Sequence, residues 1–161
     1  HVGTGHAHHI VFVCKGNVCR SPFAECYFNS LSFPENLKIE SCGLDVDQSV
    51  PSPEDASSAA REFGIDLIEN RSKGLAACDL DKADLIVAME YDHFKRLVQK
   101  LPHKENQIVL LRDFAPWPEF LACNINDPYG CDLDEFLTCF KTMRRALDRL
   151  AGQISQNQRR Q

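Results

Sequence analysis

A cysteine and an arginine six residues apart, Cys14 and Arg20, enclose a short loop that could bind an anion and attack it. Cys14 ends an apolar, β-rich run, and Ser21-Pro22 directly after Arg20 suits the first turn of a helix. Backbone N–H groups and a helix N-terminus stabilise negative charge, and the same field favours a cysteine thiolate. The planar fork of an arginine matches two oxygens of a phosphoryl group. The segment therefore predicts a nucleophile in a cradle for a tetrahedral oxyanion, especially phosphate.

The loop also contains Gly16 and a second cysteine, Cys19. We expect Gly16 to adopt a positive φ where the loop curls around the anion. A zinc clip is disfavoured because Cys-x4-Cys lacks a matching Cys or His pair. A disulfide framework is disfavoured because a chain of this size can build a core without one. We therefore expect no metal and no cofactor, and we expect most of the eight cysteines to be buried thiols in a reducing cytoplasm.

The composition is that of an ordinary globular domain. The chain has 161 residues, of which 43% are hydrophobic and 25% charged, and its net charge is −5. Nothing in this balance indicates nucleic acid or an anionic membrane as a partner, and no apolar run is long enough to span a membrane. We interpret the His- and Gly-rich residues 1–8 as a disordered expression-tag remnant, residues 9–155 as one domain, and residues 156–161 as a polar tail.

Alternating strands and helices must position the loop. The predicted strands are 9–14, 37–43, 83–90 and 107–114, and the predicted helices are 21–33, 52–64, 91–100 and 133–154. This alternation is typical of an α/β fold with a four-stranded parallel sheet and helices on both faces. In such sheets ligands bind beyond the carboxyl ends of the strands. Because Cys14 ends the first strand, the loop is expected at that edge.

The segment "VFVCKGNVCRSPFAE" resembles the signature of the low-molecular-weight protein tyrosine phosphatases, a Cys-x5-Arg-Ser/Thr motif after a buried strand. The resemblance continues with "REFGIDL", "ADLIVAME", "LLRDFAP" and "NDPYG", and it spans roughly residues 9–150. It implies the strand order 2-1-3-4, no cofactor, and a phosphate or sulfate ion in the loop. It also implies a phosphotyrosine phosphatase with acid phosphatase activity. The expected partners of such an enzyme are phosphotyrosine proteins or peptides, and we expect a monomer or a weak dimer.

The resemblance assigns roles residue by residue. Cys14 is the implied nucleophile that forms a phosphocysteine, and Asp127 is the implied acid that protonates the leaving phenol and then activates water. Ser21 and Ser41 are implied to support the loop. Cys19 is implied to form a reversible disulfide with Cys14 under oxidation. The residues implied to bind phosphate or substrate are Lys15, Gly16, Asn17, Val18, Cys19, Arg20 and Tyr129.

Several positions depart from the family's pattern. Residues 44–53 contain no aromatic side chain where the family has a Trp or Tyr on one pocket wall. We expect a more open or more acidic cavity on that side, which leaves selectivity for phosphotyrosine open. Asn70 stands where a histidine is frequent, Glu90 where an aspartate is, and Gly130 where a second tyrosine is. Lys15 adds positive charge at the cavity mouth, where it either favours acidic phosphopeptides or is simply a solvated lysine.

Three other functions stay open. An arsenate reductase on this fold needs two further cysteines close together, and Cys78 has no cysteine neighbour in the sequence. A phosphoarginine phosphatase would differ mainly in a pocket residue. A phosphoprotein-binding module is the alternative without catalysis, and the presence of Cys14, Arg20 and Asp127 argues against it. Asp127 also has an alternative role, as a turn residue before Pro128.

Overall fold

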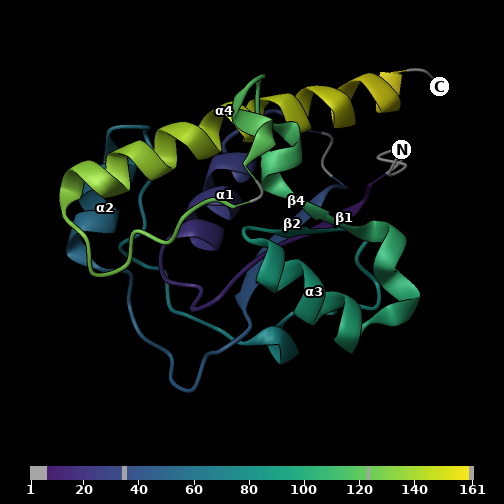
Figure 1. The fold of residues 1–161 in the computed structure, drawn as a ribbon, viewed down its shortest axis with the longest axis horizontal. Coiled ribbons are helices and arrows are strands. Elements are labelled where there is room, and N and C mark those ends of the chain that lie inside the picture. Colours follow the sequence, from purple (N-terminus) through teal and green to yellow (C-terminus); the bar gives the residue numbers. More distant parts are fainter. Residues whose placement is uncertain (1–6, 34–35, 123, 160–161) are drawn as a thin grey trace.

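Four parallel strands form the centre of the molecule. The computed structural model describes residues 7–33, 36–122 and 124–159. Within these ranges the strands are β1 (His9–Cys14), β2 (Lys38–Gly43), β3 (Leu85–Ala88) and β4 (Ile108–Leu110). They pair in the order β2-β1-β3-β4, and every pairing is parallel (Figure 1). The α/β class and the strand order expected from the sequence are confirmed.

Helices cover both faces of this sheet (Figure 1). The α-helices of the described residues are α1 (Arg20–Asn29), α2 (Glu54–Arg61), α3 (Tyr91–Lys100) and α4 (Leu133–Arg159). The short 3-10 helices are η1 (Leu75–Ala77), η2 (Pro102–Gln107), η3 (Leu111–Phe114) and η4 (Glu119–Leu121). One apolar core joins a face of the sheet to α1, α2 and α4, and a second core joins the other face to α3.

The first strand, β1, contributes side chains to both cores. Ile10 and Phe12 belong to the core beneath α1, α2 and α4, whereas Val11 and Val13 belong to the core beneath α3. Because successive strand residues face opposite sides, a central strand covered on both sides requires an unbroken apolar run. Cys14, the last residue of β1, is thereby held at the carboxyl edge of the sheet.

Several element boundaries differ from the sequence prediction by a few residues, and two of these differences have a clear physical reason. The predicted strand 107–114 is shortened because, after β4, Leu111 and Phe114 lie in η3, where they pack into the core beneath α4. The last helix continues to Arg159, beyond its predicted end at Ile154. Gln and Arg are good helix formers, so polarity alone does not end this helix.

The amino-terminal segment interpreted as a tag remnant lies partly outside the described residues, which begin at Ala7. Ala7 is only 3% exposed. The backbone N–H of His8 donates to Asp84 Oδ2 at 2.7 Å, and its carbonyl accepts from the Lys38 N–H at 2.8 Å. Ala7 and His8 therefore pack at the amino-terminal ends of the strands, just ahead of β1.

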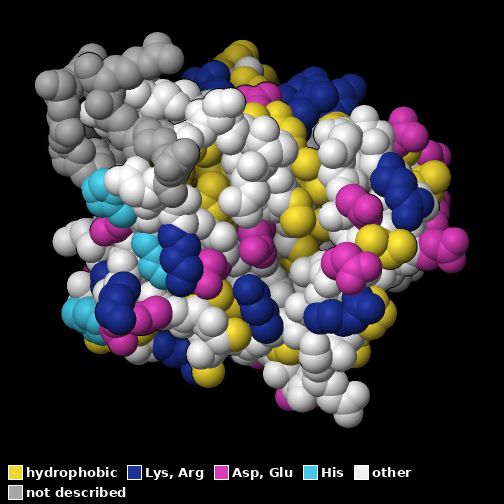
Figure 2. All heavy atoms as spheres, turned by 180° about the vertical axis from the view of Figure 1, so that it is seen from behind, with side chains coloured by type: hydrophobic (Ala, Val, Ile, Leu, Met, Phe, Trp, Pro, Cys, Tyr) yellow, Lys and Arg dark blue, Asp and Glu magenta, His cyan; other side chains and the backbone are white. Residues whose placement is uncertain are grey.

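The surface carries both signs of charge. On the face seen in Figure 2, basic and acidic side chains are interspersed, so this face has no large field of a single sign. No helix among the described residues has the length and apolarity that crossing a bilayer requires.

Candidate active site

Cys14 lies at the start of the loop that connects β1 to α1. Its side chain is buried, and its Sγ atom lies 2.9 Å from the hydroxyl oxygen of Ser21. The backbone N–H of Asn17 donates to the same sulfur at 3.2 Å. Both contacts favour negative charge on the sulfur, so the loop can stabilise a thiolate at this position.

The tight point of the loop is Asn17, not Gly16. Asn17 has a φ of +52°, and it is the one non-glycine residue in the described chain with a positive φ. The expectation that Gly16 takes this conformation is therefore wrong. Asparagine tolerates the left-handed region better than most residues because its short polar side chain can bond locally. Here the Asn17 side chain is fully buried rather than part of the cavity wall.

Asn17 connects the loop to a buried chain of hydrogen bonds. Its amide nitrogen donates to the hydroxyl oxygens of Ser21 and Ser41, each at 2.9 Å. Its amide oxygen accepts the Lys73 backbone N–H at 3.0 Å. The predicted supporting residues Ser21 and Ser41 are thus brought together by the side chain of Asn17.

A carboxylate fixes the direction of these hydrogen bonds. Ser41 donates its hydroxyl proton to Glu25 of α1, so the oxygen of Ser41 accepts from Asn17. Ser21 likewise accepts from Asn17, so its own proton is available to the sulfur of Cys14 at 2.9 Å, with the Cys42 carbonyl at 3.4 Å as the other acceptor. The sequence interpretation did not include Glu25, and its position four residues after Ser21, one helical turn along α1, was the available signal.

Gly43 at the end of β2 allows the loop to pass close to the sheet. The Leu44 N–H donates to the Cys14 carbonyl at 3.0 Å, and the Asp45 N–H donates to the Lys15 carbonyl at 2.9 Å. A Cβ atom on Gly43 would lie 2.8 Å from the Lys15 carbonyl oxygen, which is closer than real Cβ atoms approach. Gly43 is therefore a structural requirement of the loop that sequence reasoning missed.

Asn70 reaches the same loop from the segment after α2. Its side-chain amide donates to the backbone carbonyl of Asn17 at 3.3 Å and to the Ser52 hydroxyl at 3.0 Å. The departure from the family's usual histidine thus still provides a donor that supports the loop.

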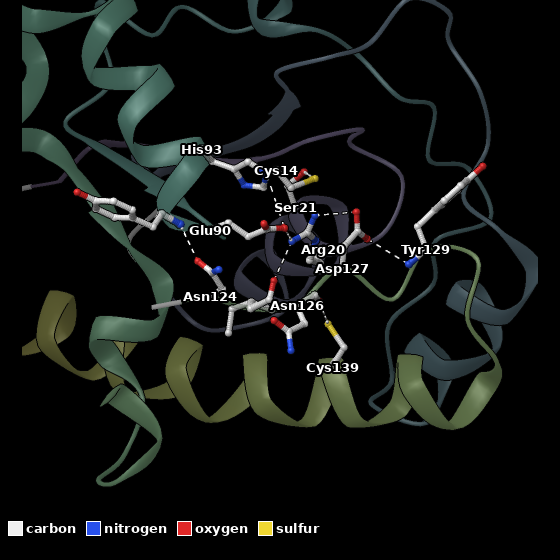
Figure 3. A network of polar contacts seen from close by, with 12 residues as sticks. Cys14, Arg20, Ser21, Glu90, His93, Asn124, Asn126, Asp127, Tyr129 and Cys139 are labelled. Atoms are coloured by element: carbon white, nitrogen blue, oxygen red, sulfur yellow. Dashed lines mark hydrogen bonds and ion pairs between the residues drawn. The ribbon is translucent and has the colours of Figure 1, made fainter. Parts of the chain in front are cut away.

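Arg20, the first residue of α1, is buried beneath the cavity and held by three groups. Its Nη1 atom donates to Glu90 and, at 2.8 Å, to the carbonyl of Ile125, while Nη2 lies 3.0 Å from Asp127 Oδ2. Figure 3 shows Glu90 and Asp127 approaching the guanidinium from opposite sides. Burial alone would lower the pKa of this guanidinium, but Cys14 and the two carboxylates hold it above its ordinary value.

Asp127 follows a segment that is docked on the end of β3. The Ile125 N–H donates to the Met89 carbonyl at 2.8 Å, and the Tyr91 N–H donates to Asn124 Oδ1 at 2.8 Å. These bonds bring Asp127 close to Arg20, although the two residues are far apart in the sequence. Its side chain is 37% exposed, so it can meet both Arg20 and a molecule in the cavity.

Tyr129 lies two residues beyond Asp127 at the mouth of the cavity. Its backbone N–H donates to Asp127 Oδ1 at 3.1 Å, which holds the carboxylate from the side opposite Arg20. The Tyr129 ring is 65% exposed and points away from the polar cluster (Figure 3). It is therefore positioned to contact the outer part of a molecule in the cavity rather than the reacting atoms.

These elements surround one cavity of about 510 Å³. Its floor is the loop after β1, and one wall is the segment after β2. Asp127 and Tyr129 form the opposite side. The lining residues are Cys14, Lys15, Gly16, Val18, Cys19, Arg20, Asp45, Val46, Asp47, Gln48, Val50, Ser72, Asp127 and Tyr129.

The wall without an aromatic side chain is nevertheless firmly held. Asp45 accepts two hydrogen bonds from Arg96 of α3, one of them at 2.9 Å, and this pairing holds the pKa of Asp45 below its ordinary value. Ser72 accepts the Val50 N–H at 2.9 Å and donates to the Gln48 carbonyl at 3.0 Å. The backbone of this segment is thus fixed by polar contacts.

The cysteines differ in their surroundings. Cys14 and Cys19 are both free, buried thiols that line the cavity. Burial and the nearby Asp127 raise the pKa of Cys19, so it is a neutral thiol at physiological pH. Cys42 and Cys78, which are far apart in the sequence, are hydrogen-bonded neighbours in the core beneath α3. Cys78 has no cysteine neighbour in the sequence, but Cys42 lies beside it in the fold.

The described residues contain no group of three or more His, Cys, Asp or Glu side chains arranged to hold a metal ion. The cationic side chains that line the cavity are Arg20 and Lys15. Of the residues singled out in the sequence, Asp127 and most of the loop line this cavity, whereas Ser41 lies behind the loop and bonds to Asn17. The structure also adds Glu25, Gly43 and Ser72.

Comparison with known proteins agrees with this arrangement. The family model for low molecular weight phosphotyrosine protein phosphatases matches residues 9–160. The low molecular weight protein-tyrosine-phosphatase Wzb of Escherichia coli (strain K12) is 29% identical over 149 residues, which are 92% of this chain and 97% of that protein. A protein-arginine-phosphatase of Bacillus subtilis (strain 168) is 27% identical over 152 residues, which are 93% of this chain and 99% of that protein.

Solved structures show the same fold. The low molecular weight protein tyrosine phosphatase from T. tengcongensis has a TM-score of 0.80 at 31% identity, with 90% of this chain and 98% of that chain covered. The YwlE arginine phosphatase from Geobacillus stearothermophilus has a TM-score of 0.83 at 26% identity, with 93% and 94% covered.

The fold and these similarities define a phosphatase, an enzyme of the hydrolase class. More closely, the chain belongs to the low molecular weight phosphotyrosine protein phosphatase family, which includes arginine phosphatases among its members.

Proposed function

We propose that this chain hydrolyses phosphotyrosine in proteins or peptides through a phosphocysteine intermediate. The observation that carries the proposal is the placement of a cysteine, a buried arginine and a carboxylate around one cavity, namely Cys14, Arg20 and Asp127. A nucleophile, an oxyanion clamp and a proton donor are the three groups that this reaction needs.

In the first step, the thiolate of Cys14 attacks phosphorus, and a sulfur–phosphorus bond forms as the bond to the phenolic oxygen breaks. Asp127 gives its proton to that oxygen, because a phenoxide leaves poorly without one. Arg20 and the N–H groups of the loop stabilise the charge on the phosphoryl oxygens. The products of this step are the dephosphorylated tyrosine and a phosphocysteine.

In the second step, Asp127 removes a proton from a water molecule, and the resulting nucleophile attacks the phosphocysteine. The sulfur–phosphorus bond breaks, which releases inorganic phosphate and restores the thiolate. The hydroxyl of Ser21, 2.9 Å from the sulfur of Cys14, stabilises the thiolate as it leaves. The same contact thus assists Cys14 as nucleophile and as leaving group.

The cavity walls favour an aryl phosphate over phosphoarginine. Val18, Val46 and Val50 offer apolar surface to an aromatic ring, and Tyr129 stands at the mouth. A guanidinium leaving group would instead need hydrogen-bond acceptors along the wall. Of the two carboxylates that line the wall beside Val46, Asp45 is already paired with Arg96, and Asp47 is the other.

The test compares hydrolysis of p-nitrophenyl phosphate, a phosphotyrosine peptide and a matched phosphoarginine peptide. The wild type is expected to cleave the two aryl phosphates with a higher kcat/KM, whereas Cys14→Ser loses activity by more than about 10⁴-fold. An active Cys14→Ser enzyme would overturn the mechanism. A higher kcat/KM for the phosphoarginine peptide would overturn the assignment of substrate class alone.

A further inference from the structure

A buried histidine lies beside the carboxylate that holds Arg20. His93, in the first turn of α3, is 3% exposed, and its Nε2 atom lies 3.8 Å from Glu90 Oε1. Its other ring nitrogen, Nδ1, is buried and has no hydrogen-bond partner. Figure 3 shows the imidazole on the same side of Arg20 as Glu90, away from Asp127. The proposed reaction gives this histidine no role.

Glu90 and Ile125 fix one edge of the guanidinium. The Nη1 atom of Arg20 donates to Glu90 and to the carbonyl of Ile125, and neither group is needed for a chemical step. The Nη2 atom faces Asp127 and the cavity instead. The orientation of Arg20 toward a phosphoryl group therefore depends on where the Glu90 carboxylate is held.

The surroundings of His93 select one form of the imidazole. A proton on Nδ1 would be a buried donor without an acceptor, which costs free energy. Nε2 instead lies 3.8 Å from Glu90 Oε1, so a proton there is attracted by a nearby carboxylate. The neutral ring protonated at Nε2 is therefore the form that fits, and burial lowers the pKa of His93 in agreement with it.

The charged groups that face His93 come from three parts of the fold. Glu90 precedes α3, and Asp92 and Arg96 lie on it. The full set is Glu90, Asp92 and Arg96, then Arg20 of α1, and Asp45 of the segment after β2. A proton added to His93 would be attracted by Glu90 and repelled by Arg20. The charged His93 and Arg20 would then compete for the Glu90 carboxylate.

We propose that His93 is a positioning residue: its neutral imidazole holds Glu90 against Arg20, and its protonation draws Glu90 away and weakens the orientation of the phosphate clamp. This inference rests on the proposed function of Arg20 in the same site. It predicts that acidification disables the clamp before the fold is lost. His93 touches no reacting atom and acts only through Glu90.

The experiment compares wild type, His93→Gln and His93→Leu with the control His103→Gln, which changes an exposed histidine paired with Asp81. The readouts are the pH profile of kcat/KM for p-nitrophenyl phosphate and the dissociation constant of inorganic phosphate. His93→Gln keeps an N–H donor, so its kcat/KM at neutral pH should stay within about threefold of the wild-type value. One ionisation should disappear from the acid limb of its pH profile. His93→Leu should bind phosphate about tenfold more weakly. His103→Gln should match wild type throughout.

Nitrogen NMR of the His93 imidazole in the wild-type protein is a second test, which requires neither enzyme activity nor a variant. A neutral ring protonated at Nε2 at neutral pH supports the proposal, and a charged ring or an Nδ1 proton overturns it. Unchanged phosphate affinity in folded His93→Leu, or an unchanged acid limb in folded His93→Gln, also overturns it. If wild type cleaves no aryl phosphate, the proposed function fails, whereas phosphate binding and NMR still decide the role of His93.

Discussion

The Nη2 atom of Arg20 lies 3.0 Å from Asp127 Oδ2, so the proposed phosphate clamp and the proposed proton donor are bonded to each other. A phosphoryl oxygen that binds this edge of the guanidinium must take the place of the carboxylate. Asp127 is then released toward the leaving-group oxygen at the moment when a substrate is present. Binding and acid catalysis are thereby coupled through one nitrogen atom.

The first prediction follows from this competition. Asp127→Asn removes a negative charge that competes with phosphate for Arg20, so inorganic phosphate should bind about three- to tenfold more tightly. Isothermal titration calorimetry measures the dissociation constant. The control Asp134→Asn changes an exposed carboxylate on α4 and should leave it unaltered. Weaker binding in Asp127→Asn would show that the carboxylate assists the clamp instead.

The same residue is expected to matter for catalysis in the opposite direction. Asp127→Ala should lower kcat by about 10²–10⁴-fold for phenyl phosphate, because the phenoxide then leaves unprotonated. The loss should be smaller for a substrate whose phenol is already acidic. A series of aryl phosphates with different leaving groups measures this slope. Equal losses across the series would contradict an acid role for Asp127.

Glu25→Gln tests the direction of the buried hydrogen bonds. The carboxylate obliges Ser41 to donate, which leaves the Asn17 amide to donate to Ser21. A glutamine can reverse the first bond, so alkylation of Cys14 by iodoacetamide at mildly acidic pH should slow by about three- to tenfold. Glu62→Gln, which changes an exposed carboxylate, serves as the control. Unchanged alkylation in Glu25→Gln would mean that the sulfur does not depend on this chain.

Gly43→Ala should damage both stability and activity. The new methyl group would lie 2.6 Å from Val46 Cγ2 and 2.8 Å from the Lys15 carbonyl oxygen, so the loop must move. We expect a loss of about 1–3 kcal/mol in the free energy of unfolding. Gly152→Ala in α4 is a matched control, because a Cβ there meets nothing within 4 Å. It should stabilise the helix by about 0.5–1 kcal/mol, and urea unfolding measures both.

Cys19 is expected to protect Cys14 from irreversible oxidation. Peroxide oxidises the Cys14 thiolate to a sulfenic acid, and the neutral thiol of Cys19 then attacks it, releasing water and forming a disulfide. A thiol reductant returns both cysteines to thiols and restores activity. Cys19→Ser should recover less activity than wild type after peroxide, whereas the exposed Cys131→Ser should recover normally. Full recovery of Cys19→Ser would remove this role.

The parts of the site that were predictable from sequence are those encoded in one contiguous segment. Cys14 and Arg20 are fixed by a strand, a loop and a helix start that follow each other directly, so their spacing carries the geometry. Asp127 could be assigned only through the resemblance, because its approach to Arg20 depends on the docking of Ile125 on Met89. Local pattern cannot reveal such a contact between distant segments.

Other features escaped prediction for related reasons. Gly43 appears in the sequence as an ordinary glycine at the end of a strand, and its need arises only when the Lys15 carbonyl passes close by. Gly16 was the reasonable choice for positive φ, yet Asn17 takes it because its side chain gains buried partners. The length of β4 depended on where Leu111 could be buried, which only the assembled core determines.

Ser72 has a consequence for how the substrate range of this enzyme can change. Its hydroxyl binds two backbone groups, the Val50 N–H and the Gln48 carbonyl, so the backbone of the wall is held without the side chains at these two positions. Residues 48 and 50 can therefore vary while the chemistry at the cavity floor stays intact. Evolution or a designed library can therefore change which phosphoesters bind by substituting these two residues, without altering the catalytic groups.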